Sequence, residues 1–521
     1  MAGIELRRSK VTDLMTRGFG YDPNSLTTKP LVFPEGSTQM DNAEFEQYSK
    51  SFTEDRFLSV YMTGSYTYNN RYTFFGSLRY DGSNMFGVDR KYKYLPLWAV
   101  SGAWNINREA FLSDADWLSD LKLRASYGVQ GNVDKDTSPL VVGEWDNTQV
   151  LPDNSESNII VSSPPNQYLR WEKTTNWNGG LDVVVLGNRI AFTADVYRRV
   201  SDDLIGMRSL PGENGFDYST MNWAKLTNRG YELSLSTVNV KTKDFRWVMD
   251  FNLAHNKSKI NRLNVRDNSY EPSREGYSVG AVFSLKTAGL DENGLQMFYN
   301  KQGEKVSFND FFGLEYGYMM GGLIPFLKSN LSAEEYRNLF TYEGTTEPKF
   351  TGGWINRFYY KNFDLTVSAS FVLDQTVQEQ PFYNPVQTSP GQNYSRRMSQ
   401  IWSPDNTSGK YPRIMGTYTE GEENWAYQWL GMLDPGNSYR KYDYWFKKMS
   451  YMRINSIRLG YTFPERLLGH IGFSSARISF EARNPFVFGS SYKGYFDPET
   501  YGNIYTQPLA KTFSCGIDLT F

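Results

Sequence analysis

The feature that most constrains this fold is an apolar and polar alternation with a period of two residues. Between Tyr72 and Tyr80, every second residue is aromatic, aliphatic or Gly, and the residues between them are mostly polar. The same alternation returns between Leu121 and Gln130. Successive side chains of a β-strand point to opposite faces, whereas a helix repeats every 3.6 residues. The pattern predicts strands of about ten residues with one apolar face and aromatic ends, which is typical of membrane-spanning β-barrels.

Composition agrees with a barrel and excludes several other classes. Phe, Trp and Tyr make up 16% of the chain, as aromatic girdles require. The mean hydropathy of −0.56 is compatible with a membrane, because a barrel strand turns only every second residue to lipid. No run approaches the roughly 18 apolar residues of a helical span. A net charge of −2 gives no basic field for nucleic acid, which is therefore not expected as a partner.

The alternation, followed along the chain, predicts about fourteen strands with short turns at one end and long loops at the other. Tight turns are expected near Asn70, Asn188, Lys243 and Asn362. The expected strands span residues 3–8, 57–68, 72–82, 94–107, 121–131, 171–186, 189–201, 226–240, 245–257, 349–360, 363–374, 450–463, 476–484 and 512–521. Because such barrels keep long loops outside the cell, the extracellular loops are expected at approximately 10–55, 132–170, 202–225, 259–347, 375–447 and 485–509.

Three local departures from regular strands are also expected. Residues 105–120 lie at the turn end, and their apolar residues predict a helical turn packed under the rim. The apolar phase slips between Ile454 and Ile457, which predicts a β-bulge near Asn455 or Ser456. Residues 281–299 are partly apolar, so they predict a structured loop or a small hairpin above the membrane.

Several motifs resemble the barrel of the SusC/RagA-type TonB-dependent transporters of Bacteroidota. They are Asn70-Arg71-Tyr72, Ser77 to Ser83, Phe86-Gly87, Pro96, Leu121 to Gly128, Gly131-Asn132, Leu169 to Thr174, Asn228 to Leu233, Tyr360 to Phe363 and Asp518 to Phe521. The order and spacing of these pieces extend the resemblance over nearly the whole chain. It implies an all-β, antiparallel transmembrane barrel in the outer membrane of a Gram-negative cell.

The resemblance further implies that the barrel formed by this chain is incomplete. Family barrels have about 22 strands around an N-terminal plug. Residues 1–521 correspond to the C-terminal part, with about fourteen strands and no plug domain. The first residues have no apolar region of the kind that a signal peptide requires, so none is expected in this chain.

The function implied by the resemblance is part of an active importer of glycans or peptides. Such a transporter is energised by TonB through the plug region, works with a SusD-like surface lipoprotein and contacts outer-membrane lipid. No cofactor is implied. Two alternatives remain open at this point. One is a secreted, soluble all-β carbohydrate-binding protein or glycoside hydrolase, which would bury one sheet against another. The other is a passive porin, which needs no plug.

The residues carry no enzymatic or metal-binding signature. His255 and His470 lie in different segments, with no Cys or Glu at ligand spacing. Acidic pairs such as Asp202 and Asp203 are better interpreted as solvated loop charge. The lone Cys515 falls in the apolar register of the last strand and is expected to face outward as a small hydrophobic residue.

Two groups of residues are candidates for contact with ligands or partners. The first crowds one long loop with aromatic side chains, which either stack on a sugar or peptide, touch a partner protein or pack the loop's own core. It comprises Trp402, Tyr411, Trp425, Tyr427, Trp429, Tyr439, Tyr442, Tyr444 and Trp445. The second group is predicted to line the lumen, where its charges meet the plug or substrate or balance other charges of the wall. It comprises Arg79, Lys122, Arg124 and Arg458.

Overall fold

The computed structural model describes most of the chain. It covers residues 1–32, 47–85, 94–135, 137–151, 154–265, 267–319, 324–389, 391–416, 421–468, 473–489, 497–500 and 506–521. His470 and the motif Phe86-Gly87 lie outside these residues.

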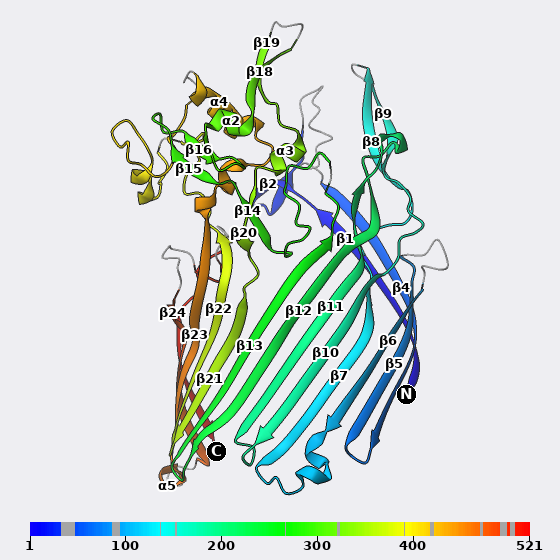
Figure 1. The fold of residues 1–521 in the computed structure, drawn as a ribbon, viewed down its shortest axis with the longest axis vertical. Helices are drawn as coiled ribbons and strands as arrows, with labels where there is room; N and C mark the ends of the chain where they lie inside the picture. Colours follow the sequence, from blue (N-terminus) through cyan, green and yellow to red (C-terminus); the bar gives the residue numbers. More distant parts are fainter. Residues whose placement is uncertain are drawn as a thin grey trace.

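Within the described residues, fourteen strands form one antiparallel sheet that curves into a tall wall (Figure 1). Each long strand pairs with the next one along the chain, so the sheet is an up-and-down meander. The strands are β1 (Ala2–Thr16), β4 (Tyr48–Tyr68), β5 (Tyr72–Ser83), β6 (Tyr94–Asn105), β7 (Leu118–Asn132), β10 (Glu172–Val185), β11 (Ile190–Ser209), β12 (Tyr218–Lys241), β13 (Phe245–Arg262), β21 (Phe350–Tyr360), β22 (Phe363–Gln378), β23 (Phe446–Thr462), β24 (Ser475–Phe488) and β25 (Thr512–Thr520).

The expected strands are all present in the expected order, but several extend further toward the loop end. β1 continues to Thr16 and β4 starts at Tyr48, so the expected loop 10–55 begins and ends inside strands. The expectation of a long loop over 202–225 is wrong, because β11 and β12 remain paired through most of it. The register between β11 and β12 shifts between Ser201 and Ile205, so the period of two is interrupted although the strands stay paired beyond it.

The tight turns are found where turn-forming residues predicted them. Asn69 and Asn70 have φ angles of 50° and 55°, and Asn188 has 66°. Positive φ at consecutive residues is the conformation of two-residue hairpin turns, which Asn adopts at little cost. Lys361 also has a positive φ of 50° in the turn before β22.

The bulge expected in the strand 450–463 is confirmed. Ser456 pairs with Ser368, but Ile454 pairs with Ala369, which leaves Asn455 as the extra residue of β23. The side-chain oxygen of Asn455 accepts a hydrogen bond from the Ser370 hydroxyl at 3.0 Å. The bulge thus shifts the apolar phase by one residue, as the sequence indicated.

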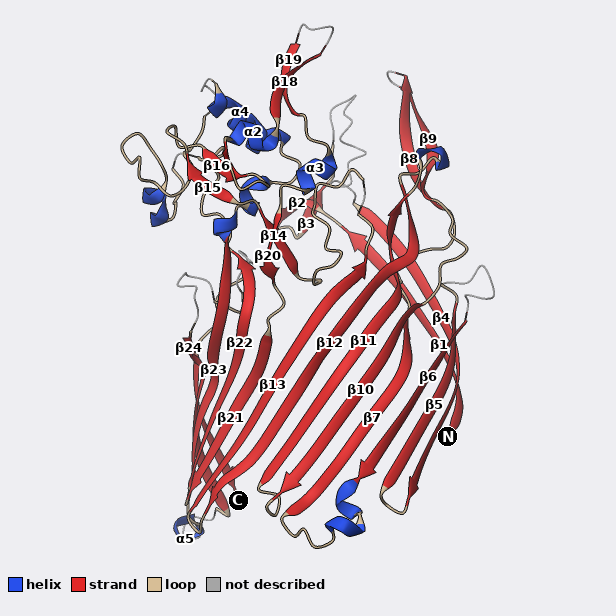
Figure 2. Ribbon diagram, in the orientation of Figure 1, coloured by secondary structure: helices blue, strands red, loops and turns tan. Residues whose placement is uncertain are grey.

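A short helical turn connects β6 to β7 at the turn end of the wall (Figure 2). It contains the 3-10 helices η3 (Ile106–Arg108) and η4 (Ala110–Leu112), as expected for 105–120. Between them, the Glu109 carboxylate accepts hydrogen bonds from the Tyr72 hydroxyl at 2.5 Å and from Trp104 Nε1 at 3.0 Å. These two bonds, with Arg71 nearby, lower the pKa of Glu109.

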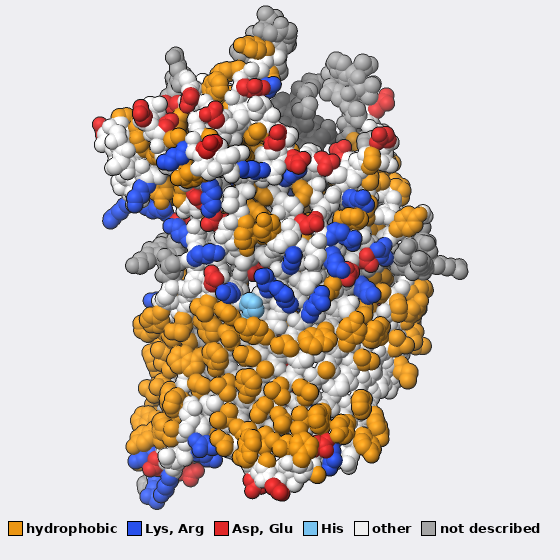
Figure 3. Space-filling model, viewed as in Figure 1, with side chains coloured by type: hydrophobic (Ala, Val, Ile, Leu, Met, Phe, Trp, Pro, Cys, Tyr) orange, Lys and Arg blue, Asp and Glu red, His pale blue; other side chains and the backbone are white. Residues whose placement is uncertain are grey.

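The two faces of the wall differ in chemistry. A broad belt of apolar side chains covers the face seen in Figure 3 over the lower part of the strands. Cross-strand aromatic pairs reinforce it, such as Phe251 with Phe371 at 6.0 Å between ring centroids. Leu78 on the same face remains 56% exposed, so no second sheet formed by the described residues covers it. One exposed apolar face identifies a lipid-facing barrel wall and excludes a sandwich of two packed sheets.

Among the described residues, no helix is both long enough and apolar enough to cross a membrane.

A second layer of small elements lies at the loop end, above the wall (Figures 1 and 2). The expected hairpin in 281–299 is present there as β15 and β16. The layer contains β2 (Phe19–Asp22), β3 (Thr27–Lys29), β8 (Val142–Leu151), β9 (Asn154–Ser163), η5 (Gly212–Asn214), β14 (Ala281–Ser284), β15 (Thr287–Leu290), β16 (Gln296–Tyr299), β17 (Lys305–Val306), α2 (Phe308–Phe312), β18 (Leu314–Met319), β19 (Ile324–Ser329), α3 (Ala333–Arg337), β20 (Thr341–Thr345), η7 (Arg396–Gln400), α4 (Glu422–Gln428), η8 (Trp429–Leu433), η9 (Ser438–Lys441) and η10 (Asp443–Trp445). At the opposite end, α5 (Glu465–Leu468) follows β23.

The wall is open along one side. Among the described residues, β1 pairs only with β4 and β25 pairs only with β24. No ladder joins residues 3–8 to 512–521, which confirms the expected gap between the two edge strands.

Candidate functional site

The polar face of the wall carries charges that are organised into cross-strand networks. Arg79 on β5 donates to Asp81 at 2.6 Å, to Glu5 on β1 at 2.9 Å and to Ser59 on β4 at 2.8 Å. Strand alternation places Arg79 opposite the apolar face that carries Leu78 and Tyr80. These contacts tie three neighbouring strands together on the side that is turned away from lipid.

A second network centres on Arg124 of β7. Its guanidinium donates to Asp182 on β10 at 2.8 Å and to Asp195 on β11 at 3.1 Å. Lys122, two residues away on the same face, lies 4.0 Å from Asp120. The strand register therefore brings together two of the predicted lumen charges, and acidic partners on neighbouring strands balance Arg124.

Arg458 differs from the other predicted lumen residues. It is exposed on the polar face of β23, between Thr366 on β22 and Glu481 on β24. Among the described residues, no acidic side chain forms an ion pair with it, because Glu481 pairs with Arg483. Arg79, Lys122 and Arg124 each have at least one acidic partner. Contact of any of these four with a plug or substrate stays a prediction.

The aromatic residues of the long loop gather in the core of the outer layer. Trp445 and Tyr442 have no exposed surface, and Trp429 and Tyr439 are 3% and 5% exposed. The rings of Tyr411 and Trp445 stack at 5.4 Å, and Trp445 Nε1 donates to the Tyr439 carbonyl at 3.0 Å. In this structure these residues pack the loop layer, in line with the last of the three interpretations.

Burial also fixes the chemistry of the tyrosines in this core. Removal from water raises the pKa of Tyr439, Tyr442 and Tyr444 well above the ordinary value, because the charged form is disfavoured there. The three phenols therefore stay neutral at physiological pH. Trp425 and Tyr427 pack against the same core and are only partly buried.

Trp402 is the aromatic candidate that borders an open hollow. It is 8% exposed and lines a hollow of about 320 Å³ together with Met398, Ile401 and Arg413. The Arg413 guanidinium lies 5.4 Å from the centroid of the Trp402 ring. Ligand or partner contact by the aromatic set stays a prediction.

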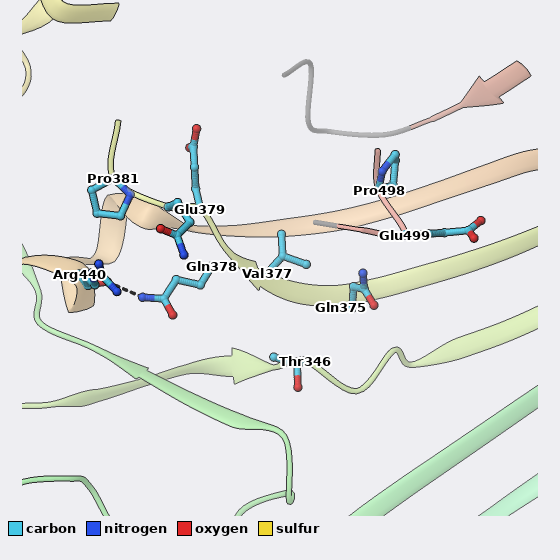
Figure 4. A pocket seen from close by; sticks show the side chains of 10 residues that line it. Thr346, Gln375, Val377, Gln378, Glu379, Pro381, Arg440, Pro498 and Glu499 are labelled. Carbon is cyan, nitrogen blue, oxygen red and sulfur yellow. Dashed lines mark hydrogen bonds between the residues drawn. The ribbon is translucent and has the colours of Figure 1, made fainter. Parts of the chain in front are cut away.

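A polar pocket of about 400 Å³ lies where β22 meets the loop layer (Figure 4). β22 contributes Gln375, Val377 and Gln378, and the amide of Gln378 donates to the Arg440 carbonyl at 2.5 Å. The remaining lining residues are Thr346, Glu379, Gln380, Pro381, Arg440, Pro498 and Glu499. Amide, hydroxyl and charged groups that converge on one hollow can bind a polar solute through several hydrogen bonds.

The acidic groups at this pocket have partners within the protein. Glu379 is 6% exposed and forms ion pairs with Arg397 and, at 3.2 Å, with Lys447. Glu499 pairs with Arg453 at 2.5 Å. The Thr346 hydroxyl donates to the Gly280 carbonyl at 3.3 Å, and the Gln375 amide nitrogen donates to Met449 Sδ at 3.8 Å. The side-chain oxygens of these two residues can still accept hydrogen bonds from a solute.

Arg453 holds one wall of the pocket in place, a role that the sequence pattern did not predict. It lies on the polar face of β23, is 2% exposed and also pairs with Asp497. The segment 497–500 is thereby anchored to the wall, with Pro498 and Glu499 at the pocket. Arg453 occupies an inward position of β23, and its register neighbours Ser370 and Val487 carry no charge. An inward Arg without an acidic neighbour on the adjacent strands was the signal that an acidic partner comes from a loop.

His255 lies at the upper edge of the apolar belt and has a structural environment. Its ring contacts Tyr231 at 5.2 Å and Phe350 at 5.3 Å, and its Nδ1 lies 2.6 Å from the Lys349 carbonyl oxygen. In the described part of the chain, no group of three His, Cys, Asp or Glu side chains is arranged to hold a metal ion. Cys515 is exposed on β25 within the apolar register.

A single antiparallel sheet with a lipid-facing belt, tight turns at one end and a large loop layer at the other is the wall of an outer-membrane β-barrel. The profile of the family described as "TonB dependent receptor-like, beta-barrel" matches residues 5–310. The chain belongs to this family, which consists of receptors and transporters rather than enzymes.

Individual relatives agree with the SusC/RagA type. The TonB-dependent receptor SusC of Bacteroides thetaiotaomicron is 28% identical over 92% of this chain and 45% of its own length. The TonB-dependent receptor P3 of Formosa agariphila is 28% identical over 91% of this chain and 46% of its own length. A chain of the RagAB peptide transporter structure superposes with a TM-score of 0.73, 22% identity, 100% coverage of this chain and 53% of that chain. The chain thus spans about half the length of the relatives it matches.

Proposed function

We propose that this chain is the C-terminal barrel wall of an outer-membrane importer of glycans or peptides, energised through TonB. Membership of the TonB-dependent receptor family carries the proposal. The likeness to SusC and to a RagAB chain supports nutrient import as the activity. A plug and a TonB-contacting segment would be supplied by a part of the protein that precedes these residues in the family arrangement.

The polar pocket beneath the loop layer is the proposed contact site for the solute. It lies where β22 meets the loop layer, at the end of the wall that an incoming solute would reach first. Gln375 and Thr346 offer uncharged hydrogen-bonding groups that suit sugar hydroxyls and peptide amides equally. The proposal therefore leaves both solute classes open at this site.

A SusD-like surface lipoprotein is the proposed partner on the outer side. The loop layer has its own aromatic core, which gives a partner protein an ordered surface to bind. Its protruding hairpins β8–β9 and β18–β19 rise furthest from the wall in Figure 1. A truncation of the β18–β19 hairpin is expected to weaken copurification of such a lipoprotein and to leave the barrel inserted.

Uptake measurements test the proposal. The protein in its own outer membrane should import either labelled oligosaccharides or labelled peptides, and a protonophore should stop that import. Gln375→Ala with Thr346→Ala should raise the KM of import about tenfold, while Glu422→Gln on α4, outside the pocket, should leave it unchanged. Import that persists without a proton gradient would support a passive porin and contradict the proposal.

A further inference from the structure

A row of basic side chains crosses three adjacent strands on the lipid-facing side of the wall. Arg198 on β11 pairs in register with Arg229 on β12, and Arg229 pairs in register with Lys257 on β13. All three are exposed. Their face is the apolar one, because Arg229 and Lys257 lie two residues beyond Tyr231 and His255, whose rings contact each other.

The row lies at the level where the apolar belt ends. At about 3.3 Å per residue, β13 runs about 40 Å from Phe245 at the turn end to Lys257. If the strand is tilted by about 45°, Lys257 lies about 28 Å from Phe245 along the membrane normal. The apolar band of such barrels is about 25 Å tall. Figure 3 shows Lys and Arg side chains gathered along the upper edge of the belt. The row therefore lies at headgroup depth on the loop side.

No described acidic residue neutralises this row. Arg198, Arg229 and Lys257 form no ion pair within the described part of the chain. Like charges directly opposite each other on neighbouring strands lower the stability of a sheet. The arrangement at the β1 edge is different, because Glu54 bridges the facing residues Arg8 and Arg56 at 2.8 and 2.5 Å.

We propose that Arg198, Arg229 and Lys257 bind the phosphate group of a phosphorylated lipid in the leaflet on the loop side. Neighbouring strands are about 4.8 Å apart, so three cations converge within about 10 Å, which suits one or two phosphate groups. Arg binds phosphate through two parallel hydrogen bonds and Lys binds it as a point charge. The apolar belt below accommodates the acyl chains, and Trp177, in register with Arg198 and 47% exposed, lies at the interface beside the site.

The proposal concerns the lipid side of the wall and is independent of the solute that the barrel imports. Lipid binding would offset the repulsion within the row, so the barrel would be most stable in a membrane that supplies the phosphate. Loss of solute import with intact lipid binding would contradict only the proposed import function. Loss of lipid binding with intact import would contradict only this lipid site.

Thermal unfolding in nanodiscs tests the site. The protein purified from its outer membrane is placed in phosphatidylcholine, with or without lipid A as a diphosphorylated probe, and unfolding is followed by tryptophan fluorescence. Lipid A should raise the Tm of the native protein, and Arg198→Gln with Arg229→Gln and Lys257→Gln should abolish that rise. Arg199→Gln is the matched control, because Arg199 adjoins Arg198 on the opposite face and contacts Tyr197.

Two further arms identify the bound group. Lipid A without its phosphates should not raise the Tm, and inorganic phosphate with phosphatidylcholine should not replace the lipid. In pure phosphatidylcholine, the triple variant should be at least as stable as the native protein, because the repulsion is gone. If the triple variant does not insert, Arg229→Gln alone should show a partial loss. The proposal would be overturned if lipid A still raised the Tm of the triple variant, or if Arg199→Gln lost the rise to the same extent. It would also be overturned if inorganic phosphate raised the Tm as lipid A does.

Discussion

The two faces of β22 place residues with opposite surroundings next to each other. Val367 lies on the apolar face between Asn356 and Ile457, while Ser368 contacts Ser456 at 2.8 Å on the polar face. Val367→Arg should cost about 2–4 kcal/mol near the membrane midplane. Ser368→Arg should cost much less, because its charge reaches water. Urea titration of the barrel in lipid vesicles measures both, and equal costs would contradict a lipid-facing assignment.

The charges of the polar face offer a second comparison between single residues. Arg124→Gln removes the partner of Asp182 and Asp195 and should cost about 1–3 kcal/mol, toward the lower end because the group is one-third exposed. Arg458→Gln should change stability by no more than about 0.5 kcal/mol, since Arg458 is exposed and its acidic register neighbour, Glu481, forms its ion pair with Arg483. The same urea titration measures the loss of unfolding free energy in both variants. A larger loss for Arg458→Gln than for Arg124→Gln would show that the Arg124 network is not stabilising.

Among the elements, the loop layer depends on its own aromatic core. Trp445 is fully buried and contacts Tyr411, Tyr439 and Tyr444. Trp445→Ala should cost about 3–5 kcal/mol of local stability, because it leaves a large cavity. Hydrogen exchange should rise in α2, α4 and η9 while the membrane strands stay protected. Equal loss of protection in the wall would mean that the layer and the wall unfold together.

The turn between β6 and β7 should respond to pH through Glu109. The folded pKa of Glu109 lies below its unfolded value because Tyr72, Trp104 and Arg71 favour the charged carboxylate. Its contribution is therefore fully present above the unfolded pKa of about 4.5 and is lost as the pH falls through the lower folded pKa. Hydrogen exchange of this turn should increase from pH 7 to pH 3, and Glu109→Gln should remove the increase.

The elements also show where sequence reasoning succeeds and where it fails. The strands were predictable within the membrane because lipid on one side enforces the period of two, and the slip at Asn455 identified a bulge. The ends of β11 and β12 were not, because the register shifts between Ser201 and Ile205 and interrupts the period of two. The aromatic candidates were identified, but their burial depends on partners far away in sequence, such as Phe298 against Tyr442 at 5.1 Å. The link from Arg453 to Asp497 has the same long-range origin.

At the scale of the whole molecule, the open side of the wall determines how the chain can exist in a membrane. β1 and β25 each have one recorded partner among the described residues, so each leaves a row of backbone N–H and C=O groups unpaired. An unpaired group costs several kcal/mol in hydrocarbon, and an open edge there is not viable. The wall therefore requires further strands, closure on itself or association with another chain.

Closure of these fourteen strands alone is the outcome that the structure disfavours, because no register between β1 and β25 is present. The 521-residue chain, refolded alone into vesicles, should not give a heat-modifiable barrel, and addition of the segment that supplies the remaining family strands should restore one.

A disulfide test reports directly on the gap between β1 and β25. With Cys515→Ser to remove the native thiol, Ile4→Cys and Ile517→Cys should not crosslink within one chain, although both positions lie on the apolar faces of the edge strands. Rapid intrachain crosslinking in the folded state would demonstrate a closed fourteen-strand barrel and contradict the open wall.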